Sequence, residues 1–489
     1  MNAILLTAIW GVIMMFSGVF IKSKSTPKYL AVIGIIIIFI ANALELDVFG
    51  KGAIHFNIDT KEMLTVKSFN LAFIGVVLGC TLLFFLLSGR DVEKVGEHPG
   101  EYFALIFFVL CGVCLVCTYN TLLLLFLGIE IMSIPLYILT GSDKRNLKSN
   151  EAALKYFLMG AFSTGIMLMG IAFIYGGNNN GSFFINNLQL GAGEMSPMIA
   201  IGLVFMVIAL SFKVSAAPFH FWTPDVYDGA PSVFTSFMST IVKVAGFFAF
   251  VRLFENSFGR VQGQWQNLIV FITVLTLFIG NVTAVFQQSV KRMLAYSSIA
   301  QAGFMMLAVF ALNDRAKEGL LLYAAAYSIA TIGIFAVLIK MNDYTIEGFN
   351  GLGKTQPLLA GCTTVFLFSL TGIPLTAGFQ SKFFMLMAAA ENTDKFWLII
   401  VAVIFAAVSA YYYFRVIQAM YFKAPEEARV VEETISTSFK IVLVICVVLI
   451  IAIGIYRSWF WGGCIIEISR KDAKVTAKPL NKYLSLIVL

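Results

Sequence analysis

Charged residues are scarce in this chain. Of its 489 residues only 12% are charged, whereas 59% are hydrophobic, and the mean hydropathy is +0.88. Soluble domains carry roughly twice that share of charge, so the composition excludes an ordinary soluble protein. Apolar runs of about 20 residues recur from end to end, and each is long enough to cross a bilayer. The sequence therefore predicts an all-α polytopic membrane protein without a sizeable soluble domain.

Residue types that hold cofactors are also few. The chain lacks a dinucleotide glycine fingerprint, a P-loop and a pair of zinc ligands. Its three histidines, too few to favour a haem or copper site, are His55, His98 and His220. The stretch CGVCLVC resembles iron–sulfur spacing, with thiols at Cys111, Cys114 and Cys117. A cluster needs a fourth thiolate and a loop that can wrap it, whereas these thiols follow one apolar helix and pack as small hydrophobes. We expect this chain to bind no cofactor or metal.

The apolar runs divide into fourteen expected membrane segments. The first, ILLTAIWGVIMMFSGVF, lacks a basic leader and a small-residue cleavage site, which favours a retained helix over a signal peptide. The twelfth is too long for one straight span and carries TGIPLTAG at its middle. The segments lie at 3–21, 29–48, 69–88, 102–118, 121–140, 152–176, 197–222, 231–254, 266–286, 293–312, 318–340, 357–390, 397–421 and 438–459.

Lysine and arginine set the expected orientation, because loops rich in them stay on the cytoplasmic side. The loops after odd-numbered segments are basic, which places the N-terminus outside, and the C-terminus too after fourteen spans. The residues in favour are Lys22, Lys24, Lys28, Lys144, Arg145, Lys148, Lys291, Arg292, Lys423 and Arg429. Those that oppose this orientation are Lys51, Lys61, Lys67, Arg470, Lys471, Lys474 and Lys478. The net charge of +7 fits such residues near the membrane and indicates no nucleic-acid partner.

Four ionisable side chains lie within or directly after the apolar runs, where a charge is costly. They are Glu130, Lys213, Lys243 and Lys382. A charge at the bilayer centre costs about 2.5 to 3.5 kcal/mol on insertion scales, so it faces the protein interior or water. An interior salt bridge that fixes helix packing would explain one such residue. Three lysines share a single carboxylate, however, so at least two have no obvious acidic partner.

Lysines in this position are able to hold and release protons. Burial disfavours the charged ammonium, whereas a nearby carboxylate favours it. A lysine held between these effects gains or loses a proton when one neighbouring charge changes. We predict that Glu130 is the partner of Lys213.

Two prolines mark interrupted segments. Pro218 follows Lys213 and Pro374 precedes Lys382. Proline removes a backbone hydrogen bond and kinks or breaks a helix, and at membrane depth the freed carbonyls need protein or cavity water. Interrupted segments in corresponding positions mark the pathway in transporters built from repeats. The seventh and twelfth segments are both interrupted, which predicts two five-helix units. The expected divisions are 1–97, 98–256, 257–425 and 426–489.

The connection FHFWTPDVYDGAP carries a separate polar group of His220, Asp225 and Asp228. One interpretation is a polar loop with turn residues and an aromatic belt at the membrane interface. The other is a point of proton uptake or release. The sequence leaves both open.

Several long motifs resemble one family. They are FKVSAAPFHFWTPDVYDGAP, KRMLAYSSIAQAGF (291–304), GIPLTAGFQSKFF (372–384), EIMSIPLYIL after Glu130, and EAALKYFLMGAFSTG (151–165). Together they are similar to the antiporter-like membrane subunits of respiratory complex I, over residues 98 to 425. Segment count, length and the third motif are closest to the subunit N branch. The resemblance implies fourteen helices with two inverted five-helix repeats, the seventh and twelfth helices being broken.

The same resemblance implies a function. Glu130, Lys213, Lys243 and Lys382 match the family's proton-relay residues, while Gln301 stands where relatives often have histidine. Glutamine does not take up a proton near neutral pH, so the link from Lys243 to Lys382 would rely more on water. FMN, iron–sulfur clusters and quinone would belong to other subunits.

The implied partners are the other membrane and peripheral subunits of complex I, especially neighbouring antiporter-like subunits, and the lipid of a bacterial inner membrane. The alternatives are an Mrp-type cation/proton antiporter, in which the same motifs occur, and an inactive membrane scaffold.

Overall fold

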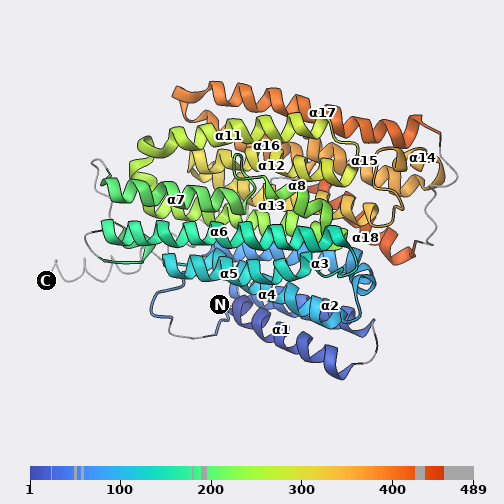
Figure 1. Cartoon of the computed structure of the whole chain (residues 1–489), viewed down its shortest axis with the longest axis horizontal. Helices are drawn as coiled ribbons and strands as arrows, with labels where there is room; N and C mark the ends of the chain where they lie inside the picture. The colour runs from blue at the N-terminus through green and yellow to red at the C-terminus, as the bar shows by residue number, and fades with distance from the viewer. Residues whose placement is uncertain are drawn as a thin grey trace.

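The computed structural model describes residues 1–21, 23, 25–48, 52–56, 60–178, 181–188, 195–424 and 435–455. Within these ranges the chain is helical, with three isolated β-bridges and no strand. Figure 1 shows the long helices running along the long dimension of the molecule. The following residues of the orientation argument lie outside the described residues: Lys22, Lys24, Lys51, Arg429, Arg470, Lys471, Lys474 and Lys478.

Every one of the fourteen expected segments contains helix. The long helices are α1 (Asn2–Phe20), α2 (Thr26–Glu45), α3 (Ser68–Val95), α4 (Pro99–Thr118), α5 (Leu122–Thr140), α6 (Leu147–Gly177), α7 (Pro197–Lys213), α10 (Lys243–Leu253), α11 (Gln262–Val285), α12 (Val290–Ala311), α13 (Asp314–Leu338), α15 (Pro357–Thr371), α16 (Ala377–Ala390), α17 (Trp397–Phe422) and α18 (Thr437–Ile455). Short helices are α8 (Trp222–Gly229), α9 (Ser232–Phe237) and α14 (Leu352–Thr355).

Eleven helices of the described ranges are long and apolar enough to cross a membrane, and α7 and α15 are shorter apolar helices. One of the eleven is a continuous helical run, Ser232–Val285, which covers all but the first residue of the eighth expected segment and the last residue of the ninth. The all-α membrane class predicted from the sequence is therefore confirmed. The division into fourteen separate crossings stays a prediction.

The interior of the molecule is built around α12 and α13. In the most apolar stretch of each helix, 94% of the residues of α12 and 100% of those of α13 are buried. In α1 and α17 the corresponding share is only 28%. In Figure 1 α1 and α17 lie at opposite edges, with α12 and α13 between them. A helix that is apolar all round belongs inside, and small residues let its neighbours approach closely. A Cβ on Gly333 of α13 would lie 2.4 Å from the Phe366 ring of α15.

The seventh segment breaks after α7. Ser215 takes a left-handed conformation with φ of 63°, and its N–H donates to the Phe212 carbonyl at 3.1 Å. The next N–H, of Ala216, donates to the Ser211 carbonyl at 2.8 Å. These two bonds form a Schellman motif, which ends a helix by turning the chain back on its last carbonyls.

The twelfth segment breaks in the same way after α15. Gly372 has a φ of 90°, and its N–H donates to the Ser369 carbonyl at 3.1 Å. The N–H of Ile373 donates to the Phe368 carbonyl at 3.0 Å.

Sequence reasoning assigned the two breaks to Pro218 and Pro374. Both helices in fact end before their proline, at Lys213 and Thr371. The prolines follow the left-handed residues Ser215 and Gly372 by three and two residues. Proline in that position keeps the helix from resuming and is common just beyond such caps.

A third irregularity lies in the eighth segment. The five residues before Lys243, Met238–Val242, form the π-helix η2, and a second π-helix, η3, spans Phe254–Phe258. A π-turn widens the helix by one residue and re-aims the side chains that follow, and it often occurs at functional sites.

Candidate functional site

Lys213 and Glu130 lie near each other without direct contact. Lys213, the last residue of α7, donates from Nζ to the Ser133 hydroxyl of α5 at 3.0 Å. Ser133 follows Glu130 by three residues, so both side chains lie on one side of α5. Among the described residues no ion pair within 4.0 Å joins Glu130 to Lys213, and the buried Oε1 of Glu130 has no hydrogen-bond partner. Any influence of Glu130 on Lys213 therefore acts through space rather than through a bonded ion pair.

Lys243 is enclosed and has no acidic neighbour in contact. It is 1% exposed. Its Nζ donates to both the carbonyl and the hydroxyl of Ser298 on α12, each at 2.9 Å, and lies 5.9 Å from the centre of the Tyr227 ring. Within the described ranges the salt bridges of this chain do not include Lys243. Neutral dipoles therefore hold this ammonium.

Lys382 reaches back across the second break. This residue of α16 is 6% exposed, and its Nζ donates to the carbonyls of Leu370 at 2.7 Å and Thr371 at 3.0 Å. These are the last carbonyls of α15, where a helix presents partial negative charge. The ring of Phe304 lies under the ammonium at 4.6 Å. The break thus supplies a cation site made of backbone.

Helix α12 connects the surroundings of the two lysines. Gln301 follows Ser298, the partner of Lys243, by three residues on α12. Its Nε2 donates to the Leu370 carbonyl at 2.9 Å, so Gln301 and Lys382 share that acceptor. Lys243 and Lys382 are therefore linked through one helical turn of α12.

Two tyrosines fix the Gln301 amide. Nε2 also donates to the Tyr413 hydroxyl at 3.2 Å, and Oε1 accepts a hydrogen bond from Tyr323. Both N–H groups and one lone pair of this amide are used. Gln301 is therefore held in one orientation by contacts to α13, α15 and α17, and its role as a relay-supporting residue stays a prediction.

The sequence pattern of the family described as "NADH:quinone oxidoreductase/Mrp antiporter, TM" matches residues 120–409, more than half of the chain. The chain belongs to this family. The family region contains the predicted site residues from Glu130 to Lys382 and both helix breaks.

Relatives within the family are similar over nearly their whole length. A protein of Cytophaga hutchinsonii named NADH-quinone oxidoreductase subunit N is 38% identical over 93% of this chain and 98% of its own length. A protein of Flavobacterium psychrophilum with the same name is 37% identical over 93% and 98%. The predicted resemblance to complex I antiporter-like subunits is confirmed.

Solved structures give the same fold. A chain of respiratory complex I from Thermus thermophilus superposes with a TM-score of 0.79 at 30% identity, covering 93% of this chain and 97% of that one. A chain of the Mrp complex from Dietzia superposes with a TM-score of 0.82 at 18% identity, covering 96% and 95%. The second likeness concerns the fold alone.

The polar group after the first break is an ion-pair cluster in this antiporter-family chain. Asp225 of α8 accepts hydrogen bonds from Lys155 of α6 at 3.0 Å and from Arg292 of α12 at 3.2 Å. Burial alone would raise the pKa of Asp225, but these two cations hold that pKa below its usual range. The Asp228 carboxylate oxygen Oδ2 lies 4.0 Å from Nη1 of Arg292. The buried His220 is separate from this cluster, and its Nδ1 has no partner among the described residues.

Sequence reasoning missed the ion pair between Lys155 and Asp225, because a lysine near the start of a helix is usually an ordinary surface charge. It also missed the contacts made by Ser133 and Ser298. The motifs EIMSIPLYIL and AYSSIA carried these serines, but hydroxyls are too common in membrane helices to stand out.

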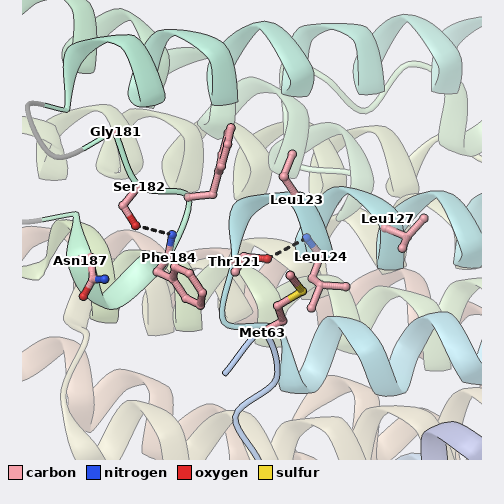
Figure 2. Close-up of a pocket in the computed structure, with 10 residues that line it drawn as sticks. Met63, Thr121, Leu123, Leu124, Leu127, Gly181, Ser182, Phe184 and Asn187 are labelled. Atoms are coloured by element: carbon pink, nitrogen blue, oxygen red, sulfur yellow. Dashed lines mark hydrogen bonds between the residues drawn. The ribbon is translucent and has the colours of Figure 1, made fainter. Parts of the chain in front are cut away.

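Two other features lie apart from the lysines. Cys111, Cys114 and Cys117 are free, buried thiols of α4. A pocket of about 680 Å³ lies at the start of α5, and none of the predicted site residues lines it (Figure 2). It is lined mainly by apolar side chains of α5 and of the loop 181–187. At the start of α5, the Thr121 hydroxyl caps the helix by accepting from the Leu124 N–H at 3.2 Å.

Proposed function

We propose that this chain is a proton-translocating membrane subunit of NADH:quinone oxidoreductase, the respiratory complex I of a bacterial inner membrane. The observation that carries the proposal is the line of enclosed cationic sites in which Lys243 and Lys382 are held by neutral groups. Because no carboxylate of the described residues pairs with either lysine, each ammonium is able to lose its proton to a hydrated neighbour. The names of the curated relatives support the assignment.

The relay begins at Glu130 and Lys213. A change of charge near Glu130 alters how strongly Lys213 holds its proton, because the two interact through a low-dielectric interior. Lys213 then passes its proton toward Lys243, and Lys382 releases it. Pro218 and Pro374, together with the caps before them, keep the two breaks open to water and side chains. Gln301 and His220 support the path without forming its main stations.

The outer face of α5 is proposed to meet a neighbouring antiporter-like subunit. Exposed apolar side chains form a stripe along α5, and half-buried Glu130 lies within it. The stripe consists of Leu123, Leu127, Ile134 and Ile138, which are 47% to 53% exposed. Such a face packs against lipid or another membrane helix, and a buried unpartnered carboxylate oxygen favours a polar partner over lipid. We assign the redox chemistry of FMN, iron–sulfur clusters and quinone to other subunits.

The proposal includes an internal arrangement and an orientation. Residues 98–256 and 257–425 form two five-helix units, flanked by 1–97 and 426–489. The shared capping of the two breaks supports this division, because corresponding helices end by the same motif. By the basic loops, the N-terminus faces the periplasm.

The test is proton uptake by vesicles that contain the assembled complex, measured per NADH oxidised. Arginine keeps the charge of a lysine but hardly deprotonates, since its pKa exceeds about 12. Lys243→Arg should therefore reduce pumping on the order of tenfold in complex that assembles normally. Full pumping by this variant would refute the relay and favour a structural role for Lys243.

A second candidate is an Mrp-type cation/proton antiporter subunit, which the shared family description and the fold of the Dietzia chain keep in view. It predicts sodium-for-proton exchange in vesicles that lack NADH. Purification of the chain in a large assembly with flavin and iron–sulfur spectra, without such exchange, would exclude it.

A further inference from the structure

A pocket of about 620 Å³ lies at one end of the helix bundle, apart from the proposed relay. Its wall is formed by the last residue of α2, loop residues 53 and 55, residues 66–71 at the start of α3, the end of α10 with η3, and the first two turns of α13. None of the predicted site residues lines it. The pocket therefore lies between the N-terminal three helices and the rest of the chain.

Arg252, near the end of α10, is an enclosed cation of this wall with unused donors. It is only 8% exposed. Its Nε donates to the Tyr119 carbonyl at 3.0 Å and its Nη1 to the Cys117 carbonyl at 3.3 Å, both at the end of α4. Nη2 bonds to no described residue and is not one of the polar atoms sealed in the interior. Because Arg252 lines the pocket, we infer that this part of the guanidinium is directed into it.

The wall carries a surplus of positive charge. Its two carboxylates are already paired, Glu45 with the Met1 amine and Glu255 with Lys317 at 2.5 Å. The guanidinium remains, and Lys67 adds a positive charge at the exposed rim. A buried charge is costly unless it is paired, and the carbonyls at a helix end carry only about half an elementary charge. The pocket is therefore suited to an anion.

Much of the remaining wall is apolar. It includes Phe69 of α3, Phe248 and Val251 of α10, and Leu320 of α13. The volume equals that of roughly twenty water molecules at about 30 Å³ each, far more than one inorganic anion fills. It lies within the roughly 300 to 1,000 Å³ of sites that take organic ligands. An occupant that fills this pocket therefore has an anionic group and an apolar body.

We propose that the pocket binds an anionic membrane lipid, with the lipid phosphate on Arg252 and the glycerol and upper acyl chains on the apolar wall. The fork of a guanidinium matches two phosphate oxygens, and basic pockets between membrane helices suit anionic head groups. The pocket lies where membrane helices begin and end, which is the level of lipid head groups. The assignment is independent of the proposed relay, because it concerns binding and not proton transfer.

The position of the pocket gives the lipid a structural part. Its wall combines α3 of the proposed unit 1–97, α10 of 98–256 and α13 of 257–425. A lipid held there contacts all three units at once. It would fill the space between them and neutralise the one cation of the wall that is both buried and without a carboxylate partner.

The test uses the assembled complex in vesicles of phosphatidylglycerol and phosphatidylethanolamine. A small share of the phosphatidylglycerol carries a photoreactive diazirine close to its glycerol, and mass spectrometry locates the adducts on this chain after illumination. Exposed side chains such as Phe16 of α1 react with bulk lipid in every sample and give the reference. We expect adducts also on Phe248 and Val251, which are only 3% and 5% exposed and which bulk lipid does not reach.

Arg252→Gln should reduce the pocket adducts on the order of tenfold relative to the reference, because a charge-assisted hydrogen bond to phosphate is lost. The matched control is Arg415→Gln. Arg415 also donates to the end of a helix, to the Val285 carbonyl of α11 at 2.7 Å, but does not line the pocket. This control should be labelled like wild type. Equal labelling of the pocket in wild type and Arg252→Gln would overturn the proposal.

A second pair of variants leaves Arg252 in place, for the case in which Arg252→Gln does not assemble. Ala53 is exposed and lines the pocket, so Ala53→Trp should fill the rim and abolish the pocket adducts. The next residue, Ile54, is 62% exposed and does not line the pocket, so Ile54→Trp should leave the adducts unchanged. Pocket adducts that survive Ala53→Trp, or that both variants lose equally, would contradict the proposal.

A high-resolution cryo-EM map distinguishes a lipid phosphate from free phosphate. In complex kept in the same lipids, with inorganic phosphate added, density beside Nη2 of Arg252 should continue into acyl-chain density along Phe248 and Leu320. Isolated phosphate density would assign the site to the free anion and overturn the lipid. An empty pocket would overturn the anion site as well.

Discussion

The two helix breaks are built alike but hold their lysines in different ways. Both half-helices end in a Schellman motif, at Ser215 and at Gly372. Lys213 lies just before its break and donates to a side-chain hydroxyl, near a carboxylate on another helix. Lys382 lies after its break and donates only to backbone carbonyls of the half-helix across the gap. The partial negative charge on a backbone carbonyl is fixed, whereas a carboxylate can gain a proton or change its pairing partner.

This difference assigns different parts to the two breaks. In the proposed relay the field at Lys213 would be adjustable, because a change in the pairing of Glu130 would alter it. The field of the backbone carbonyls at Lys382 would stay constant. The first break would then receive a signal from a neighbour, and the second would pass a proton on.

The largest expected effect concerns the second break. In Lys382→Arg the guanidinium still donates to the α15 carbonyls, so the cap and the charge are kept, but the proton is not released. We expect proton uptake per NADH to fall on the order of tenfold, with normal assembly. Lys382→Met should lose the cap as well and assemble less well. Arg tolerated and Met harmful for pumping would show that Lys382 is a fixed structural charge.

A smaller effect is expected at the first break. Glu130→Gln removes a charge that acts on Lys213 without touching it, which is worth about 1 kcal/mol and thus about fivefold in rate. Glu130→Asp keeps the charge and should be milder. Ser133→Ala provides the comparison, because it removes the direct hydrogen bond to Lys213 and leaves the carboxylate. If Glu130→Gln pumps like wild type while Ser133→Ala does not, hydrogen bonding rather than the carboxylate field controls Lys213.

Sequence reasoning singled out the ionisable residues of the candidate site but not their contacts. Glu130, Lys243 and Lys382 stood out because a charge in an apolar run is costly wherever it lies. Ser133 and Ser298 did not, because a hydroxyl in a membrane helix costs little and its partner comes from a helix distant in sequence. The breaks were placed correctly but attributed to proline, since the left-handed conformation of Ser215 is not visible in composition. The predicted pairing of Glu130 with Lys213 came from counting charges along the sequence. Such a count does not give the distance between the two side chains.

The caps themselves offer a stability comparison. Gly372 has a positive φ, and a Cβ there would lie 3.1 Å from Cδ of Lys382. Gly372→Ala should therefore cost about 1 to 2 kcal/mol. Ser215→Gly should change stability by less than about 0.5 kcal/mol, because relief of the left-handed strain offsets the entropy of glycine. The thermal midpoint of the assembled complex measures both. If Gly372→Ala and Ser215→Gly lowered the thermal midpoint equally, the two breaks would not share one capping geometry.

The smallest effect concerns what fastens the half-helix after the first break. Asp225 connects α8 to α6 and α12 through Lys155 and Arg292. After the second break, α16 is connected to α18 by the neutral side chain of Gln380, whose Nε2 donates to the Gly454 carbonyl at 3.2 Å. These ion pairs are partly exposed and screened, so Asp225→Asn should cost only about 0.5 kcal/mol.

The pH dependence of this effect follows from the lowered pKa of Asp225. Its contribution is present above the unfolded pKa of about 3.9 and is lost as pH falls through the lower folded value. The stability difference between Asp225→Asn and wild type should therefore be flat from roughly pH 5 to 8 and shrink with added salt. A difference that disappears already between pH 8 and 6 would show that another group, such as His220, controls the cluster, and the first break would then respond to pH where the second does not.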